Sequence, residues 1–441
     1  MNRRSVLATG VVGLVGSTGC VRPADESTSD ATVERTPPRD GGRWRMADHD
    51  PAASGHAPGV TPSRPGDPAW TTTLPPKELL WGAAVDGERV YYGATDHAPT
   101  PSESRIVARS VTDDTVAWSR SVPYTGVSTP ALGVGPGGRQ ALFLASGQDH
   151  SNTGPGHGVV WALDPTTGEQ WWEWAVDADL GGLVAADGTL LTATTALDHV
   201  AVWALNATDG TERWTVPLDR WLRATPTVHD VTVYVGSANE RLRALSLADG
   251  TVEWQIETTG YSRPVIDRHR SRLYLGQLNG VRAFDLDGGG EAWFHRTTGP
   301  FVAERDRLGV TDEPVVTPEA VIVRTSDTSD FAVGDPGQCH GLDPATGERV
   351  WSLPAGRPAS SLVGAGGRVL LRRDLAAGSG TPVRDDPSTN ELIAVTADGT
   401  VRWSRPGVWH PVAVGADRLV AYRGALERFS GKVTVGCFSV G

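Results

Sequence analysis

The loop from Gly147 to Gly158 holds residue types that could bind a metal ion. It contains Asp149, His150 and His157, and His199 further along the chain could join them. Imidazole and carboxylate groups are ligands of transition metals. Their spacing matches no established ligand pattern, so ordinary polar loop residues are the alternative. We therefore predict no metal site and keep Asp149, His150 and His157 as candidates for a binding surface.

Two arginines could bind an anionic ligand. Arg223 and Arg263 stand just before apolar segments, and a guanidinium group suits carboxylates and phosphates. Salt bridges to acidic residues of neighbouring structural units are the alternative. Asp327 and Asp330 could bind Ca²⁺, but they lack the Gly and the bidentate Glu of an EF-hand loop, which favours a solvated turn.

No catalytic group can be assembled from the remaining residues. The histidines are scattered, so neither a Ser-His-Asp nor a Cys-His arrangement is indicated. No Lys follows the glycines of the loop from Gly147 to Gly158, so it is not a phosphate-binding loop. We predict no catalytic residues.

The elements that must position these residues come from a repeat. Eight copies combine short β-branched or aliphatic runs with a turn and a Trp, and in most copies a Gly precedes the Trp by four residues. In the copy that ends at Trp118, Asp114 replaces the Gly, and Asp tolerates the left-handed conformation. The anchor tryptophans are Trp70, Trp118, Trp172, Trp214, Trp254, Trp293, Trp351 and Trp403, and the turn glycines are Gly168, Gly210, Gly250, Gly289, Gly347 and Gly399.

The repeat length predicts the fold. Successive anchors are separated by 48, 54, 42, 40, 39, 58 and 52 residues, which with four short strands per unit is typical of a β-propeller. Pro opens several of the innermost strands, because Pro cannot donate to a strand ladder. Each of the eight repeats contains a recurring second strand. These strands are Arg89 to Gly93, Ala141 to Ala145, Thr189 to Ala193, Thr232 to Gly236, Arg272 to Gly276, Ala320 to Arg324, Arg368 to Arg372 and Arg418 to Tyr422.

The two ends of the repeat array are out of phase. Trp70 has no preceding strands of its own, and the C-terminal copy stops before it reaches a Trp. A strand from Ala69 to Leu74 would complete that last copy and remove the open sheet edges. We predict an all-β, eight-bladed β-propeller of four-stranded antiparallel blades, closed by an N-terminal strand that joins the C-terminal blade.

The N-terminus predicts export. Arg3 and Arg4 precede a short apolar run that ends in small residues followed by Cys20, as in a twin-arginine lipoprotein signal. An ordinary cleaved signal with an incidental Cys is the alternative. We expect a signal peptide over 1–20, a flexible polar linker over 21–43, a lead-in segment over 44–68 and the propeller over 69–441. A lipidated Cys20 would anchor the chain to the outer face of the cytoplasmic membrane.

Composition limits the partners. The net charge is -12, and Lys77 and Lys432 are the only lysines among 40 basic residues, as in proteins of halophilic archaea. Such an acidic surface argues against nucleic-acid binding. Cys339 and Cys437 fall in third strands two blades apart, so we expect neither a disulfide nor a metal site. We expect a monomer.

These repeats resemble the pyrroloquinoline quinone (PQQ)-like β-propeller family, which includes quinoprotein dehydrogenases and BamB-type lipoproteins. The resemblance covers about residues 44 to 441, and its most specific segments are Ala162 to Trp172 and Gly341 to Trp351. Trp44 to Pro58 resembles the lead-in of export-directed members. The adjacent Cys pair and the Ca²⁺ ligands of the quinoprotein alcohol dehydrogenases have no counterpart here, so the resemblance implies neither PQQ nor Ca²⁺ as a cofactor.

Three long insertions indicate where a partner would bind. They run from Gly147 to Gly158, from Thr325 to Gln338 and from Ala376 to Asn390, each between a second and a third strand. Loops at one repeat position emerge on one face, whereas variable loops without a partner are the alternative. We predict a protein-binding or scaffolding module at the cell surface. A PQQ-dependent dehydrogenase and a carbohydrate or small-ligand binding protein remain the alternatives.

Overall fold

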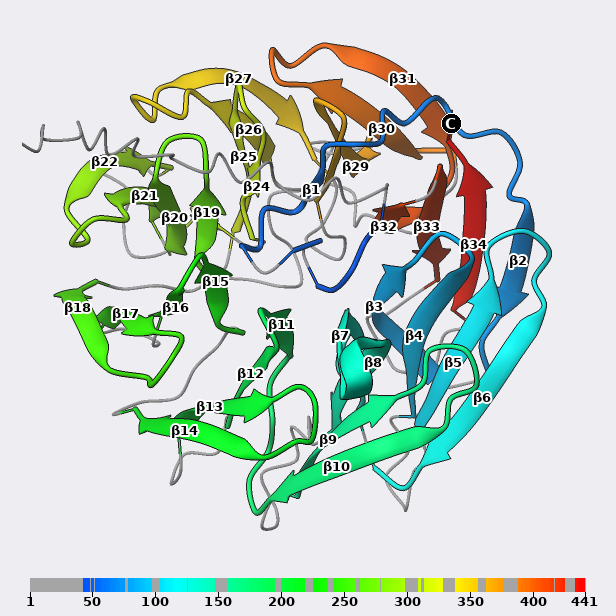
Figure 1. Cartoon of the computed structure of the whole chain (residues 1–441). Helices are drawn as coiled ribbons and strands as arrows, with labels where there is room; N and C mark the ends of the chain where they lie inside the picture. The colour runs from blue at the N-terminus through cyan, green and yellow to red at the C-terminus, as the bar shows by residue number, and fades with distance from the viewer. Residues whose placement is uncertain are drawn as a thin grey trace, which may run out of the picture. The chain divides into compact units, whose positions relative to one another are not determined.

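The described part of the chain forms a ring of eight β-sheets (Figure 1). The computed structural model describes residues 43–440 except 48, 51, 76–77, 97–103, 125, 147–156, 195–199, 219–224, 237–240, 259–261, 278, 298–307, 311–312, 328–337, 356–361, 376–387, 416 and 425–432. Within these residues there is no α-helix, and the 3₁₀ turn η1 (Pro136–Gly138) is the single helical element. The predicted all-β propeller is confirmed.

Blades 1 to 4 each contain four consecutive antiparallel strands, numbered from the innermost to the outermost. They are β3 (Glu78–Val85), β4 (Arg89–Asp96), β5 (Ser104–Ser110) and β6 (Val116–Val122); β7 (Ala131–Val134), β8 (Gln140–Ser146), β9 (Gly158–Leu163) and β10 (Gln170–Val176); β11 (Val184–Ala186), β12 (Thr189–Ala193), β13 (Ala201–Asn206) and β14 (Glu212–Pro217); and β15 (Thr227–His229), β16 (Thr232–Gly236), β17 (Arg241–Ser246) and β18 (Val252–Glu257).

Blades 5 to 8 repeat this order with additions. They are β19 (Val265–Asp267), β20 (Arg272–Gln277), β21 (Gly280–Asp285) and β22 (Glu291–Arg296); β23 (Leu308–Val310), β24 (Val315–Val316), β25 (Val321–Asp327), β26 (Gln338–Leu342) and β27 (Arg349–Pro354); β28 (Val363–Ala365), β29 (Arg368–Asp374), β30 (Asn390–Thr396) and β31 (Val401–Pro406); and β32 (His410–Gly415), β33 (Arg418–Arg423), β34 (Thr434–Ser439) and β2 (Trp70–Thr73).

The N-terminal strand completes the last blade, as predicted. Strand β2 pairs antiparallel with β34, with Trp70 opposite Cys437 and Thr73 opposite Thr434. Two blades have more than four strands. In blade 7, β1 (His56–Ala57) pairs parallel with β28, and in blade 6 both β23 and β24 pair with β25. Every blade thus has the predicted four antiparallel strands, and blades 6 and 7 each carry one strand more.

The anchor tryptophans lie on the outermost strands and tie each blade to the next. In six blades the indole Nε1 donates a hydrogen bond of 2.6 to 3.2 Å to a backbone carbonyl of the following blade. The six pairs are Trp118 with Pro165, Trp172 with Ala207, Trp214 with Leu247, Trp254 with Leu286, Trp293 with Pro344, and Trp351 with Ala397. We call this contact the tryptophan lock.

A glycine is required at each lock for two reasons. The six turn glycines have φ between 72 and 84°, the left-handed region that other residues avoid. A Cβ at any of them would lie 2.5 to 2.8 Å from the tryptophan of the preceding blade, closer than packing allows. Asp114, which replaces the glycine in blade 1, also has a left-handed φ of 60°, as predicted.

The third strand provides a small residue opposite each anchor. An alanine stands there in six blades, Gly341 stands opposite Trp351, and Cys437 stands opposite Trp70. The alanine pairs are Ala108 with Trp118, Ala162 with Trp172, Ala204 with Trp214, Ala244 with Trp254, Ala283 with Trp293, and Ala394 with Trp403. The small side chain leaves room for the indole, which explains the recurring alanine of the sequence pattern.

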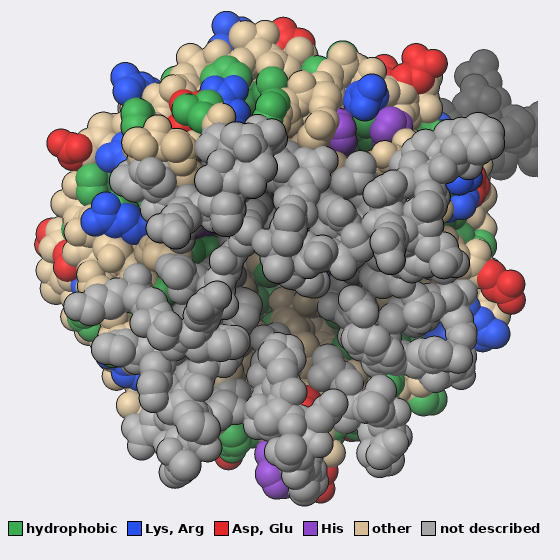
Figure 2. Space-filling view, turned by 180° about the vertical axis from the view of Figure 1, so that it is seen from behind, with side chains coloured by type: hydrophobic (Ala, Val, Ile, Leu, Met, Phe, Trp, Pro, Cys, Tyr) green, Lys and Arg blue, Asp and Glu red, His purple; other side chains and the backbone are tan. Residues whose placement is uncertain are grey.

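The two faces of the ring differ. The turn face carries the connections from first to second and from third to fourth strands. The loop face carries the connections from second to third strands, including the three long insertions after β8, β25 and β29. Most residues of these insertions lie outside the described ranges. Figure 2 shows the ring from the side opposite to Figure 1, with basic and acidic side chains interspersed around the described rim.

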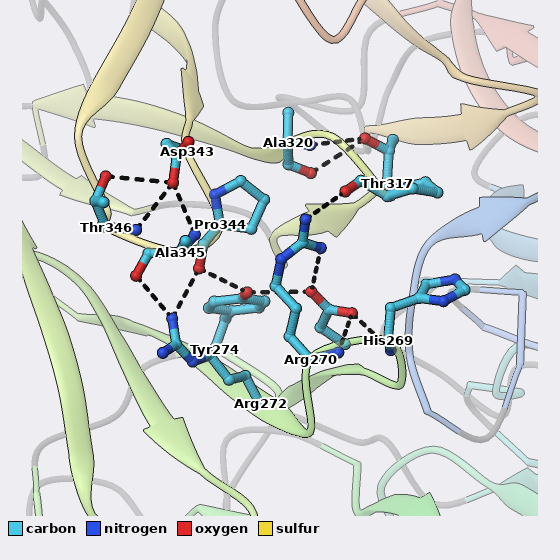
Figure 3. A network of polar contacts seen from close by, with 12 residues as sticks. His269, Arg270, Arg272, Tyr274, Thr317, Ala320, Asp343, Pro344, Ala345 and Thr346 are labelled. Carbon is cyan, nitrogen blue, oxygen red and sulfur yellow. Dashed lines mark hydrogen bonds and ion pairs between the residues drawn. The ribbon is translucent and has the colours of Figure 1, made fainter.

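One lock is reinforced by a polar network (Figure 3). In blade 6 the carbonyl of Pro344 accepts hydrogen bonds from Arg272 Nη1 at 3.0 Å and from Tyr274 Oη at 3.3 Å, both in blade 5. Asp343 Oδ1 accepts from the backbone N–H of Thr346 at 2.9 Å, which fixes the turn. The Asp-Pro-x-Thr-Gly motif therefore shapes a turn that receives the neighbouring blade.

Candidate functional site at the central channel

The lead-in segment lies inside the ring against the innermost strands (Figure 1). Its backbone pairs with Val85 of blade 1 and Leu132 of blade 2, and then with Ile266, Val316 and Gly364 of blades 5, 6 and 7, at N···O distances of 2.6 to 3.1 Å. The inner strands of a propeller leave their channel-side backbone groups unpaired, and the lead-in satisfies part of that requirement. The central channel is therefore occupied by the protein's own chain.

Asp50 holds the lead-in in shape. Its carboxylate accepts hydrogen bonds from Ser54 N at 3.0 Å and from Ser54 Oγ at 3.1 Å, and it lies 3.4 Å from Arg268 Nη2 of blade 5. Burial alone would raise its pKa. The hydrogen bond and charge of His49, the charge of Arg268 and the Ser54 N–H outweigh burial and hold the pKa of Asp50 well below its usual range.

His56 is a second buried polar residue of the lead-in. Burial lowers its pKa to about 4, and the charge of His49 adds to that effect, whereas Asp50 opposes it. The neutral ring accepts a hydrogen bond at Nε2 from the Gly367 N–H, at 3.4 Å. This bond joins the lead-in to the first turn of blade 7.

Arg263, one of the predicted ligand-binding residues, fastens the lead-in instead of facing open solvent. Its guanidinium donates to Ala47 O of the lead-in at 3.3 Å, to Pro226 O at 3.0 Å and to Thr227 Oγ1 at 3.2 Å. The side chain is buried, and these contacts link blade 5 to blade 4. The described contacts are to neutral oxygens, and an anionic ligand for Arg263 stays a prediction.

A second polar cluster lies toward the loop face in blades 6 to 8. Arg372 Nη1 donates to His410 Nε2 at 2.8 Å, and Arg372 Nε donates to Asn390 Oδ1 at 2.8 Å. Burial and the charges of Arg372 and Arg324 lower the pKa of His410 well below its usual value, so the ring is neutral. Arg324 and Arg372 are both almost fully buried. Their positive potential suits a carboxylate or phosphate group.

Sequence reasoning missed this cluster. Arg324 and Arg372 end the second strands that the sequence predicts, whereas the observed strands β25 and β29 continue to Asp327 and Asp374. His410 begins β32, the innermost strand of blade 8. An Arg at the end of a strand that is otherwise apolar was the available signal, since an arginine is rarely fully buried without a specific partner. The apolar pattern predicts the strands but not the cluster at their ends.

Of the other predicted site residues, the structure describes His157 only. Asp149, His150 and Arg223 lie outside the described residues. His157 is exposed on the loop face and pairs with Asp177 of the same blade, with Nδ1 and Oδ1 3.2 Å apart. Within the described ranges, no three His, Cys, Asp or Glu side chains are arranged to bind a metal.

The two described cysteines are buried, lie in different blades and are not joined by a disulfide. Burial raises the pKa of Cys437 to about 12, and Arg418 partly opposes this effect. Its Sγ donates to Val111 O at 3.5 Å, so the thiol serves packing at the ring closure. Cys20 lies outside the described residues. No helix in the described part of the chain is long and apolar enough to cross a membrane.

Comparison of the sequence with family models identifies the repeat. The model described as "Outer membrane protein assembly factor BamB" matches residues 156–329 and 277–435, more than half of the chain. The chain belongs to the PQQ-like repeat β-propeller family. Among curated proteins, no sequence match was found.

Solved structures of this architecture include proteins with different printed roles. BamB from Moraxella catarrhalis aligns with a TM-score of 0.55 and 16% identity, over 84% of this chain and 96% of that chain. The quinohemoprotein alcohol dehydrogenase ADHIIG from Pseudomonas putida HK5 aligns with a TM-score of 0.65 and 12% identity, over 91% and 81%. The corresponding enzyme from Comamonas testosteroni gives 0.62 and 14%, over 91% and 81%. At these identities the likeness shows the PQQ-like propeller fold alone.

Proposed function

We propose that this PQQ-like propeller is a binding or scaffolding module that presents its loop face to a protein partner outside the cytoplasm. The occupied channel is the observation that carries the proposal. Because the lead-in lies in the channel against the inner strands, we infer that recognition uses the loop face, where the connections with the three long insertions begin and end. The similarity to an assembly factor supports a role in protein binding.

The N-terminal sequence supports the location. Under this proposal, Arg3 and Arg4 direct export, and acylation of Cys20 tethers the chain to the outer face of the cytoplasmic membrane. The polar residues that follow Cys20 then act as a spacer between the membrane and the propeller.

The proposal is tested by site-specific photo-crosslinking in the full chain. A crosslinker at His157 samples the loop face, and the same crosslinker at Val231 samples the turn face. These positions are matched because the side chain of His157 is 67% exposed and Val231 is 70% exposed. We expect one defined adduct with another exported protein from His157 and none from Val231. Equal labelling from both positions, or no adduct at either, would overturn the proposal.

A second candidate function is binding of a small anionic ligand, including PQQ, near the loop face. The buried pair Arg324 and Arg372 beside neutral His410 favours it, because these guanidinium groups suit carboxylates. Calorimetric titration of the full chain with PQQ and Ca²⁺ in high-salt buffer tests it. Saturable stoichiometric binding that Arg372→Gln abolishes would establish this second function, whereas absence of heat would exclude PQQ.

A further inference from the structure

A cavity of about 400 Å³ lies on the turn face between blades 2 and 3. The innermost strands of these blades, β7 and β11, lie side by side near the centre of the ring (Figure 1). The lead-in forms one wall of the cavity, and residues of the β7–β8 and β11–β12 connections form the others. Its volume falls within the range of small-molecule binding sites, about 300–1,000 Å³.

The lead-in contributes two arginines to this cavity. Trp44 is buried and pairs with Val85 of blade 1, with N···O distances of 3.0 and 2.7 Å, and Leu132 N of blade 2 donates to Arg45 O at 2.7 Å. These bonds fix the backbone on both sides of Trp44. Neighbouring side chains of a paired segment point to opposite sides, so Arg43 and Arg45 point away from Trp44, and both line the cavity.

Blade 3 contributes the opposite charge. Asp187 lines the cavity from the β11–β12 turn, where it has a left-handed φ of 45°. Among the described residues, the side chains of Arg43 and Asp187 form no hydrogen bond or ion pair, with each other or with other groups. Positive and negative charges therefore line separate walls of one cavity, and both remain available to a ligand.

The space between these charges has apolar walls. Val134 at the end of β7 is 60% exposed, whereas Leu132 and Ala207 beside it are buried. A Cβ at Gly138 or at Gly188 would meet no atom within 4 Å, so the cavity is open at both glycines. An apolar group in this space would remove the exposed part of Val134 from water, which favours binding.

We propose that this cavity binds a zwitterionic amino-acid compound with an apolar side chain, either a free amino acid or a short peptide. Its carboxylate accepts charge-assisted hydrogen bonds from Arg43, and Arg45 adds a second positive charge. Its ammonium group pairs with Asp187, and its side chain covers Val134. Charges of both signs on separate walls suit a ligand that carries both signs better than a simple anion. The cavity lies on the turn face, so this ligand is separate from the partner of the loop face.

The site is tested by calorimetric titration of the full chain with leucine and with leucyl-leucine. We expect saturable binding of at least one of them, and the tighter of the two assigns a free amino acid or a peptide. The N-acetyl form of that compound lacks the ammonium group, and its amide lacks the carboxylate. Each analogue should bind at least about tenfold more weakly. No saturable binding of either zwitterion, or an analogue that binds as tightly as its parent, would overturn the proposal.

Two variants remove the charges of the cavity one at a time. Arg43→Gln changes an exposed side chain, and Asp187→Asn keeps the turn because Asn tolerates the left-handed conformation. We expect each variant to weaken binding of the tighter zwitterion at least about tenfold, because each removes a charged partner. Their urea unfolding curves should match the wild type, which assigns the loss to the cavity. Binding that either variant leaves unchanged would contradict the site.

Matched controls separate the cavity from the overall charge. Asp230 has a left-handed φ of 50° in the corresponding turn of blade 4, and Arg402 is an exposed arginine of β31 in blade 7; neither lines the cavity. We expect Asp230→Asn and Arg402→Gln to change the affinity by less than about twofold, since a distant surface charge acts weakly. Losses equal to those of Asp187→Asn and Arg43→Gln would show that net charge alone controls binding, and would overturn the site.

Discussion

The six regular blade junctions and the closing blade solve the same packing problem differently. At a regular junction the indole N–H of the anchor docks on a turn carbonyl of the next blade, and a glycine leaves space for the ring. The outermost strand of blade 8 comes from the N-terminus, so the lead-in takes the place of the turn in this blade. Trp403 Nε1 of blade 7 donates to Pro62 O of the lead-in at 3.0 Å. The repeat supplies six locks, and the lead-in supplies a seventh.

The junction from blade 8 to blade 1 lacks the lock altogether. Trp70 Nε1 is buried and has no hydrogen-bond partner among the described residues. Asp114 carries a Cβ where the other blades have glycine, so the Trp70 ring cannot take the regular position. Arg109 lies over the Trp70 ring, with its guanidinium carbon 5.6 Å from the ring centre, and pairs with Asp114. An ion pair and a cation–π contact replace the hydrogen bond here.

The largest effect is expected from filling a regular lock. Gly347→Ala places a methyl group about 2.5 Å from Trp293 and forces a left-handed alanine. We expect a loss of about 2–4 kcal/mol of unfolding free energy, from overpacking and backbone strain together. Gly188→Ala is the control, because Gly188 has the same φ of 73° and open space around its Cβ position. It should cost about 1 kcal/mol in urea unfolding. Equal losses of unfolding free energy in the two variants would mean that the indole ring of Trp293 does not require the space at Gly347.

The second largest effect on stability is expected from a comparison of two anchor tryptophans, one with a lock hydrogen bond and one without. Trp214→Phe removes the bond to Leu247 O and leaves that carbonyl unpaired, whereas Trp70→Phe removes a donor that has no partner. Both side chains are buried to a similar degree. We expect Trp214→Phe to cost about 1–3 kcal/mol more than Trp70→Phe. Parallel denaturation curves measure the difference, and equal losses would show that the lock hydrogen bond contributes little.

The repeat made the ring predictable, because each blade must bury the same faces. The Gly and Trp spacing predicted eight blades, and the phase shift at Trp70 predicted the closure. The path of the lead-in could not be predicted in the same way. Its contacts with the inner strands use backbone groups, which carry no sequence period. Trp44 to Pro58 resembles a lead-in in its sequence, but no local pattern indicated the contacts that Asp50 and His56 make.

For the candidate site, the sequence could predict only the face of the ring on which it lies. The position of the insertions between second and third strands follows from the repeat, and in the structure the strands that flank them meet these connections on one face. The buried pair Arg324 and Arg372 comes together from different blades, so no local pattern joins them. Arg263 shows the same limit, since sequence placed it before an inner strand but gave no reason to expect the carbonyl of Ala47 as its acceptor.

The lead-in should also make the stability of the protein sensitive to acid, through His56. The folded pKa of His56 is lowered to about 4, below the ordinary value of 6.5, so the unfolded chain binds more protons between these values. Stability therefore falls as the pH drops from 6.5 to 4, and we expect His56 to contribute about 1–2 kcal/mol of the loss at pH 5.

His56→Gln tests the direction of this pH dependence of stability, measured by urea unfolding at pH 7 and pH 5. The variant should lose less stability than the wild type between these pH values. Some acid sensitivity should remain, because burial also lowers the pKa of His340 to about 4. His157→Gln is the control, since His157 is exposed. The idea fails if His56→Gln and the wild type lose the same free energy.

The smallest effect is expected at the irregular junction itself. Asp114→Gly relieves the left-handed strain of a non-glycine residue but also removes the partner of Arg109, so the two terms nearly cancel and the net change should stay within about 1 kcal/mol. A double-mutant cycle with Arg109→Ala separates them. In the Arg109→Ala background the ion pair is already absent, so Asp114→Gly should stabilise the protein by about 0.5–1 kcal/mol. If the glycine has the same effect in both backgrounds, the Arg109–Asp114 pair does not hold the junction, and the stacking of Arg109 on Trp70 must do so alone.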